Sequence, residues 1–78
     1  MLNVVFNMSK KGLYQTIGEN IIREREKKNM SQGRLAFLCD IDRSYMGKIE
    51  KGKVNSTLKT LHRISKVFKV DISKLTKP

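Results

Sequence analysis

The spacing of apolar residues from Thr16 onward predicts a series of short helices. Apolar side chains recur there at the three- and four-residue intervals of an amphipathic helix. The first predicted helix covers residues 17–28, opens with the capping-box pair Thr16 and Glu19, and ends at Asn29. Met30 is expected to anchor the following connection to the core.

Two shorter helices follow and are joined by a tight turn. Ser31 is a natural N-cap for the second helix, residues 40–41 form the turn, and Asp42 caps a third helix over residues 43–51. Gly52 then lies at the position where glycine commonly ends a helix. The residues expected to be buried on these two helices are Leu35, Ala36, Cys39, Met46 and Ile49.

A fourth helix is predicted over residues 57–68, with Ser56 as its N-cap, and Asp71 can cap one last turn over residues 72–75. Its inward positions are Leu58, Leu61, Ile64, Val67 and Phe68. No segment alternates apolar and polar residues for long enough to form a sheet strand. The chain is therefore predicted to be all-α, with four to five short helices.

Residues 1–15 lack this helical period and are expected to form an N-terminal arm that precedes the domain at residues 16–78. Residues 4–6, Val-Val-Phe, could form a short strand or simply a frayed terminus. Met8 is an alternative natural start to Met1.

The size and charge of the chain exclude some classes of function and favour others. The chain has 78 residues, with 17 Lys and Arg against 7 Asp and Glu, which gives a formal net charge of +10. A domain this short buries only about 60% of the surface of its unfolded chain, which excludes a multidomain enzyme with a deep cleft. The positive charge favours a polyanionic partner, with nucleic acid ahead of an acidic lipid surface or an acidic protein.

Residue chemistry excludes several kinds of site. Cys39 is the only cysteine and His62 the only histidine, so neither an intrachain disulfide nor a zinc cluster is expected. Paired catalytic carboxylates and a glycine-rich phosphate loop are also missing from the sequence, so we expect no enzyme, cofactor or metal. No apolar run approaches the roughly 20 residues that span a bilayer, and we expect a cytoplasmic protein with no membrane partner.

The second and third predicted helices, with their tight turn, describe a helix-turn-helix unit. An α-helix fits the major groove of B-DNA when a second helix braces it and its outer face stays polar. Such a face is expected on the third helix, where the outward residues are Arg43, Ser44, Gly47, Lys48 and Lys51. Gly47 lowers the helix propensity there, and close approach to the DNA backbone and simple drift are two explanations.

The chain resembles the Cro/C1-type (XRE-like) class of helix-turn-helix DNA-binding regulators in two runs, SQGRLA at residues 31–36 and IDRSYMGKIEKG at residues 41–52. Within that class, DRSY followed by IEKG is similar to the controller proteins of restriction-modification systems. The resemblance covers residues 16–75 and implies a compact lambda-repressor-like domain.

The resemblance also implies roles for individual residues. Base edges would be contacted by Arg43, Ser44 and Lys48. DNA phosphates would be contacted by Gln32, Tyr45, Lys53 and Asn55. Arg25 and Glu50 would form an internal salt bridge.

A single recognition helix spans few base pairs, so a sequence-specific regulator usually pairs two modules on a palindromic operator. We therefore expect a homodimer. The apolar candidates for its interface are Leu61, Val67, Phe68, Ile72 and Leu75. The expected function is a transcriptional regulator of the controller kind that binds its own promoter. A phage- or plasmid-type repressor of the same class, and an antitoxin whose main partner is a protein, are the alternatives.

Overall fold

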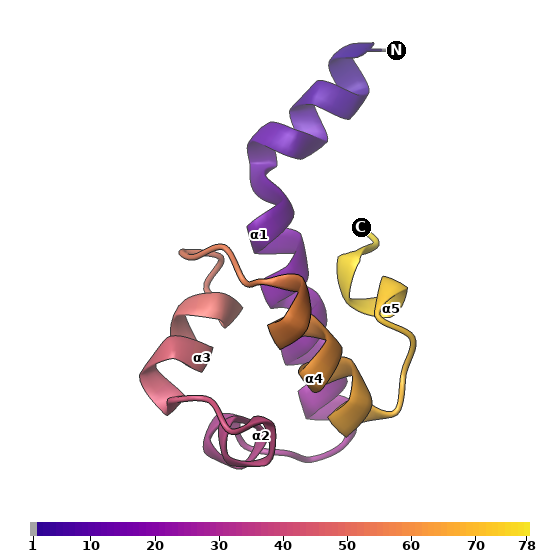
Figure 1. The fold of residues 1–78 in the computed structure, drawn as a ribbon. Helices are drawn as coiled ribbons and strands as arrows, with labels where there is room; N and C mark the ends of the chain where they lie inside the picture. The colour runs from indigo at the N-terminus through magenta and orange to yellow at the C-terminus, as the bar shows by residue number, and fades with distance from the viewer. Residues whose placement is uncertain (1) are drawn as a thin grey trace.

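The computed structural model describes the backbone of residues 2–78 and the side chains of residues 12–78. The described chain holds five helices and no strand, which confirms the all-α prediction (Figure 1). The helices are α1 (Leu2–Lys27), α2 (Gln32–Cys39), α3 (Arg43–Glu50), α4 (Leu58–Phe68) and α5 (Ser73–Thr76). None of these helices is long and apolar enough to cross a membrane.

The first helix begins earlier than the sequence predicted. Residues 4–6 lie inside α1, so the suggestion of a strand there is wrong. Thr16 is not the N-cap of this helix, because the residues before it are already helical. The helical geometry breaks instead at Gly12, whose φ of 109° and ψ of 114° suit a residue without a Cβ atom. The far end agrees with the prediction, because α1 ends at Lys27 and Asn29, two residues later, takes a left-handed φ of 52°.

The helix-turn-helix unit forms with the predicted caps. Ser31 accepts a hydrogen bond from the backbone N–H of Arg34 at the start of α2. Asp42 accepts from the backbone N–H groups of Ser44 and Tyr45 at the start of α3. Between the helices, Asp40 adopts the left-handed conformation, with φ 57° and ψ 47°. This short turn fixes the angle at which α3 leaves α2.

One hydrophobic core joins the helices. In this core α1 packs against α3 and α5, and α2 packs against α3 and α4. Its buried apolar residues are Ile17, Ile21, Leu35, Ala36, Cys39, Met46, Ile49, Leu61, Ile64, Phe68 and Leu75. Met30 packs against this cluster from the connection after α1, as predicted.

The start of α4 differs from the prediction. Thr57, rather than Ser56, is the N-cap and accepts a hydrogen bond from the backbone N–H of Thr60, while Ser56 is buried. Leu58 was expected to face inward but is 74% exposed. Leu58 is therefore not part of the hydrophobic core.

The last helix is held by a residue of the first. Asn20 is buried in α1, and its amide nitrogen donates to the backbone carbonyls of Leu75 at 2.9 Å and Lys77 at 2.7 Å. Asp71 accepts from the backbone N–H of Ser73, so it supports α5 although the helix starts one residue later than predicted.

This packing corrects part of the proposed dimer interface. Leu61, Phe68 and Leu75 are at most 4% exposed within one copy of the chain, so they belong to the core and cannot form an interface. Spacing alone could not separate core from interface because both need the same apolar stripe. Val67 and Ile72 are partly buried against the core and retain some exposed surface.

Candidate nucleic-acid interface

The helix α3 is braced from behind by a close approach of α1. A Cβ atom at Gly18 would lie 2.7 Å from the backbone oxygen of Ile49 and would also collide with that of Glu50. Just after α3, Gly52 has a φ of 71° and lies against the backbone of Gln15 in α1. The C-terminal end of α3 is therefore fixed to α1 by backbone packing that only glycine permits.

A buried ion pair ties the same end of α3 to α1 and α2. Arg25 donates from Nε to Oε2 of Glu50 at 2.9 Å and from Nη2 to Oε1 at 3.0 Å. It also donates from Nη1 to the backbone oxygen of Met30. Hydrogen bonds to Glu50 raise the pKa of Arg25 above its ordinary value, although burial opposes the shift. The Arg25–Glu50 salt bridge that the family resemblance implied is thus present in the fold.

Gln32 joins this network from the first turn of α2. Its Nε2 donates to Oε1 of Glu50 at 3.0 Å, which occupies one of the two amide hydrogens. The second amide hydrogen and the side-chain oxygen remain available to a ligand. This bond could not be predicted from the sequence, because the two residues lie 18 positions apart in different helices.

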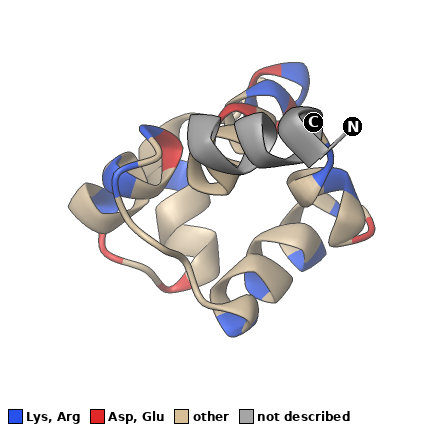
Figure 2. Ribbon diagram, turned by 90° about the horizontal axis from the view of Figure 1, so that it is seen from above, with Lys and Arg blue, Asp and Glu red and all other residues tan. Residues whose placement is uncertain are grey.

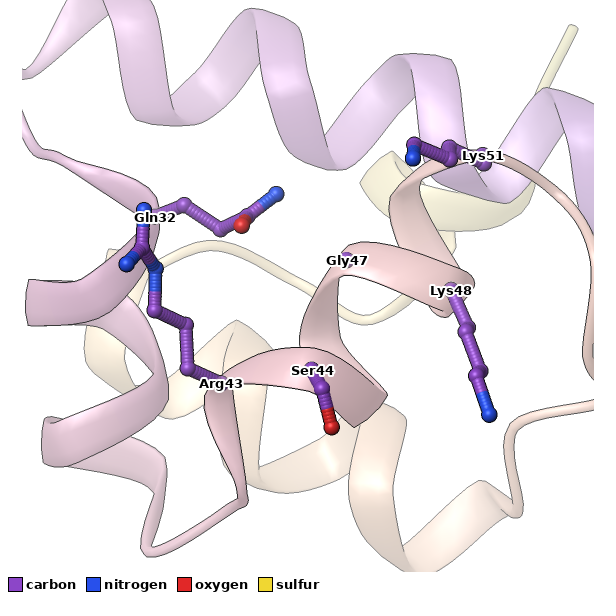
Figure 3. A pocket seen from close by; sticks show the side chains of 6 residues that line it. All are labelled: Gln32, Arg43, Ser44, Gly47, Lys48 and Lys51. Carbon is purple, nitrogen blue, oxygen red and sulfur yellow. The ribbon is translucent and has the colours of Figure 1, made fainter.

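A shallow concavity of about 540 Å³ lies between α2 and the outer side of α3. The residues that line it are Gln32, Arg43, Ser44, Gly47, Lys48 and Lys51 (Figure 3). Three of the six carry a positive charge, and no acidic residue is among them. Four of the seven residues predicted to contact DNA therefore lie in one site: Gln32, Arg43, Ser44 and Lys48.

Besides Gln32, Ser44 already has a hydrogen-bond partner in the protein. Ser44 donates its hydroxyl hydrogen to Asp42, so toward a ligand its oxygen can act only as an acceptor. That bond and the backbone N–H groups of α3 lower the pKa of Asp42 below its ordinary value of 3.8. The side chain of Arg43 runs along α2, where its Cδ and Nε atoms lie 3.7 Å from the position of a Cβ on Gly33.

The remaining predicted contact residues lie outside this concavity. Tyr45 is partly buried against the hydrophobic core. Lys53 and Asn55 are exposed in the connection between α3 and α4. These three residues flank the site and do not line it.

Gly47 and Lys51 also line the site, although neither was among the seven residues predicted to contact DNA. Their position could have been found from helical spacing, because Arg43, Gly47 and Lys51 follow one another at four-residue intervals and share one face of α3. That face is the one turned away from the core.

The positive charge is not confined to this surface. Figure 2 shows Lys and Arg on several helices. Two acidic residues, Glu24 and Glu50, are buried and paired with the α1 cations Lys27 and Arg25, which do not line the concavity. The site is distinguished by three cations beside a concave surface rather than by charge alone. Among the residues whose side chains are described, no group of acidic, Cys and His residues could hold a metal ion.

Comparison with known proteins agrees with this architecture. The helix-turn-helix family profile matches residues 21–75. The control protein C.BamHI of Bacillus amyloliquefaciens is 48% identical over 44 residues, which are 56% of this chain. The chain spans about half of that relative, 54% of its length. C.SmaI of Serratia marcescens is 33% identical over 61 residues, covering 78% of this chain and 73% of that protein.

A solved structure shows the same arrangement. The restriction-modification controller protein C.AhdI from Aeromonas hydrophila superposes with a TM-score of 0.77 and 31% sequence identity. The superposition covers 80% of this chain and 94% of that one. This chain therefore belongs to the helix-turn-helix family, in which restriction-modification control proteins are among its relatives.

Proposed function

We propose that this protein is a transcriptional regulator that binds double-stranded DNA at a specific sequence, as a restriction-modification controller acting on its own promoter. The proposal rests on one observation: a concave surface with three cations, Arg43, Lys48 and Lys51, on the helix α3, which packs against α1 on its other side. Its relatives are control proteins, and C.AhdI is described as a restriction-modification controller. The protein needs no cofactor for this function and performs no catalysis.

In this function α3 enters the major groove, and the residues that line the concavity meet base edges. Arg43 presents a planar guanidinium suited to the O6 and N7 acceptors of guanine. Lys48 donates to base acceptors beside it. Ser44 meets a base donor, such as the amino group of cytosine or adenine, because its own hydrogen is held by Asp42.

Phosphates on either side of the groove fix the register. The free amide hydrogen of Gln32 points to one phosphate, assisted by the unpaired backbone N–H groups at the start of α2. Tyr45, Lys53 and Asn55 contact further phosphates along the flank of α3. The Arg25–Glu50 pair acts through Gln32 and α3, holding both in place without touching DNA.

The protein acts as a homodimer on a palindromic operator. One α3 covers too few base pairs to be specific, whereas two copies double the site. The surface that carries Val67 of α4 and Ile72, the residue just before α5, remains the candidate interface, since both keep exposed area.

The test is selection from a pool of random duplex DNA, followed by affinity measurement on the enriched sequence. Wild-type binding should weaken with salt at a slope of about −0.9 per phosphate contacted. Arg43→Ala should lower affinity for the enriched DNA about tenfold or more, as the loss of a bidentate base contact predicts.

Lys74→Ala is the matched control, because it removes one exposed positive charge from α5, on the opposite side of the molecule from α3 (Figure 1). It should change affinity far less than Arg43→Ala. If both variants lost the same affinity for the enriched duplex, the binding would be explained by general charge attraction alone. Failure of the wild type to enrich any sequence would contradict the proposed function.

A further inference from the structure

Gly47 occupies the centre of the concave surface of α3. Arg43 lies one helical turn before it and Lys51 one turn after it, and Figure 3 shows Ser44 and Lys48 beside it. Any duplex that contacts these cations at the same time lies directly over the backbone at Gly47.

Nothing inside the protein requires glycine at this position. Gly47 does not adopt a positive φ, unlike Gly12 and Gly52. A Cβ atom there would lie 3.5–3.8 Å from the side chain of Gln32, which is ordinary van der Waals contact. Glycine in a helix interior is also less stable than alanine, and α3 has only eight residues.

Gly18 differs from Gly47 in this respect. A Cβ at Gly18 would collide with the backbone of α3, so packing explains that glycine completely. Packing and backbone conformation both fail to explain Gly47. The remaining difference between glycine and alanine is on the outward side, where the missing methyl group leaves the backbone bare.

We propose that Gly47 determines sequence specificity, by leaving space for the C5-methyl group of a thymine in the major groove. Thymine carries the one apolar group that projects from a base edge into that groove. The bare backbone at Gly47 lets α3 approach an A·T pair so that this methyl fills the volume that a Cβ would take. The inference rests on the proposed DNA-binding function and adds one base pair to its recognition.

The experiment compares the wild type with Gly47→Ala on the duplex that the wild type enriches. Gly47→Ala should melt at the same temperature or higher, because it removes a helix-destabilising residue without a collision. Its affinity for the enriched duplex should nevertheless fall about tenfold or more, within the range of a lost base contact. Its affinity for a random duplex should be unchanged.

A thymine-to-uracil scan of the same duplex tests the mechanism, since uracil lacks only the C5-methyl group. At one position in each half-site, uracil should restore the affinity of Gly47→Ala toward the wild-type value. The same change should weaken wild-type binding slightly. Such a crossed effect shows that the alanine methyl and the thymine methyl compete for one volume.

His62→Ala is the control, because His62 is exposed on α4 and does not line the concavity. It should bind all duplexes like the wild type. Unchanged affinity of Gly47→Ala for the enriched duplex would overturn the inference while leaving the proposed function intact. Unfolding of Gly47→Ala, or a loss that no uracil position restores, would overturn it too. Failure of the wild type to enrich any duplex would remove both.

Discussion

Glu50 is a single residue through which three helices are connected. Its carboxylate accepts two hydrogen bonds from Arg25 of α1 and one from Gln32 of α2, while its own backbone ends α3. The side chain of Glu50 is 3% exposed, so its charge has little contact with water. A buried carboxylate of this kind is stable only while its cation and hydrogen-bond partners remain.

Arg25→Met should therefore destabilise the protein by about 3 kcal/mol or more, because methionine keeps much of the stem but leaves the charge of Glu50 unpaired. Urea unfolding followed by circular dichroism measures this. Glu26→Gln is the control, because that residue is an exposed neighbour on α1. If Arg25→Met lowered the free energy of unfolding no more than Glu26→Gln does, the Arg25–Glu50 pair would add nothing to stability.

The cap of α3 gives stability that depends on pH. The hydrogen bond from Ser44, together with the backbone N–H groups of α3, lowers the pKa of Asp42 from 3.8 in the folded state. A carboxyl whose folded pKa is lowered contributes stability above its unfolded pKa and loses it as the pH falls through the folded value.

Asp42→Asn keeps a capping side chain but cannot titrate. Its melting temperature should fall less than that of the wild type as the pH is lowered from about 5 to 2. Parallel curves for the two proteins would show that ionisation of Asp42 contributes nothing.

Some roles of single residues could be predicted from the sequence and others could not. Ser31 and Asp42 were identified as caps because a cap bonds to residues two or three positions away. The bond from Gln32 to Glu50 could not be identified because it depends on how α2 and α3 fold together. Leu58 was misplaced for a similar reason, since its exposure depends on whether another helix covers it.

At the scale of whole elements, the position of α3 is set by glycine contacts with α1. The backbones approach so closely at Gly18 that no side chain fits between them. Amphipathic patterning predicted that these helices exist and which residues face the core. It could not predict the close approach, because glycine carries no apolar signal.

Gly18→Ala should destabilise the protein by about 1–3 kcal/mol, the usual cost of overpacking, and should weaken DNA binding by displacing the end of α3. Thermal unfolding and binding to the selected duplex measure the two effects. Gly33→Ala is the matched control, since a Cβ there would have its nearest neighbours 3.7 Å away. Equal stability of the two variants would contradict the close approach.

At the scale of the whole molecule, one copy of the chain carries one helix-turn-helix unit, α2 and α3. Regulators with this unit pair two copies so that the recognition helices meet half-sites about 34 Å apart. Three of the five predicted interface residues proved to be core, so the pairing surface must be formed by side chains that remain exposed.

We predict that the duplexes selected by the wild type are inverted repeats with that spacing, and that sedimentation equilibrium shows twice the mass of the 9.0 kDa chain. The half-site alone should bind much more weakly. A monomeric mass at all concentrations, together with selection of single half-sites, would show that the chain acts alone.

The hydrogen bonds from Asn20 have a consequence for synthesis on the ribosome. Asn20 is made early, yet the carbonyls that satisfy its amide lie 55 and 57 residues later in the chain. Until Lys77 has left the exit tunnel, a buried amide lacks its partners and α5 cannot close over α1. The docking of α5 on α1 therefore follows the synthesis of Lys77, and any part of α1 that folds earlier does so without these two hydrogen bonds.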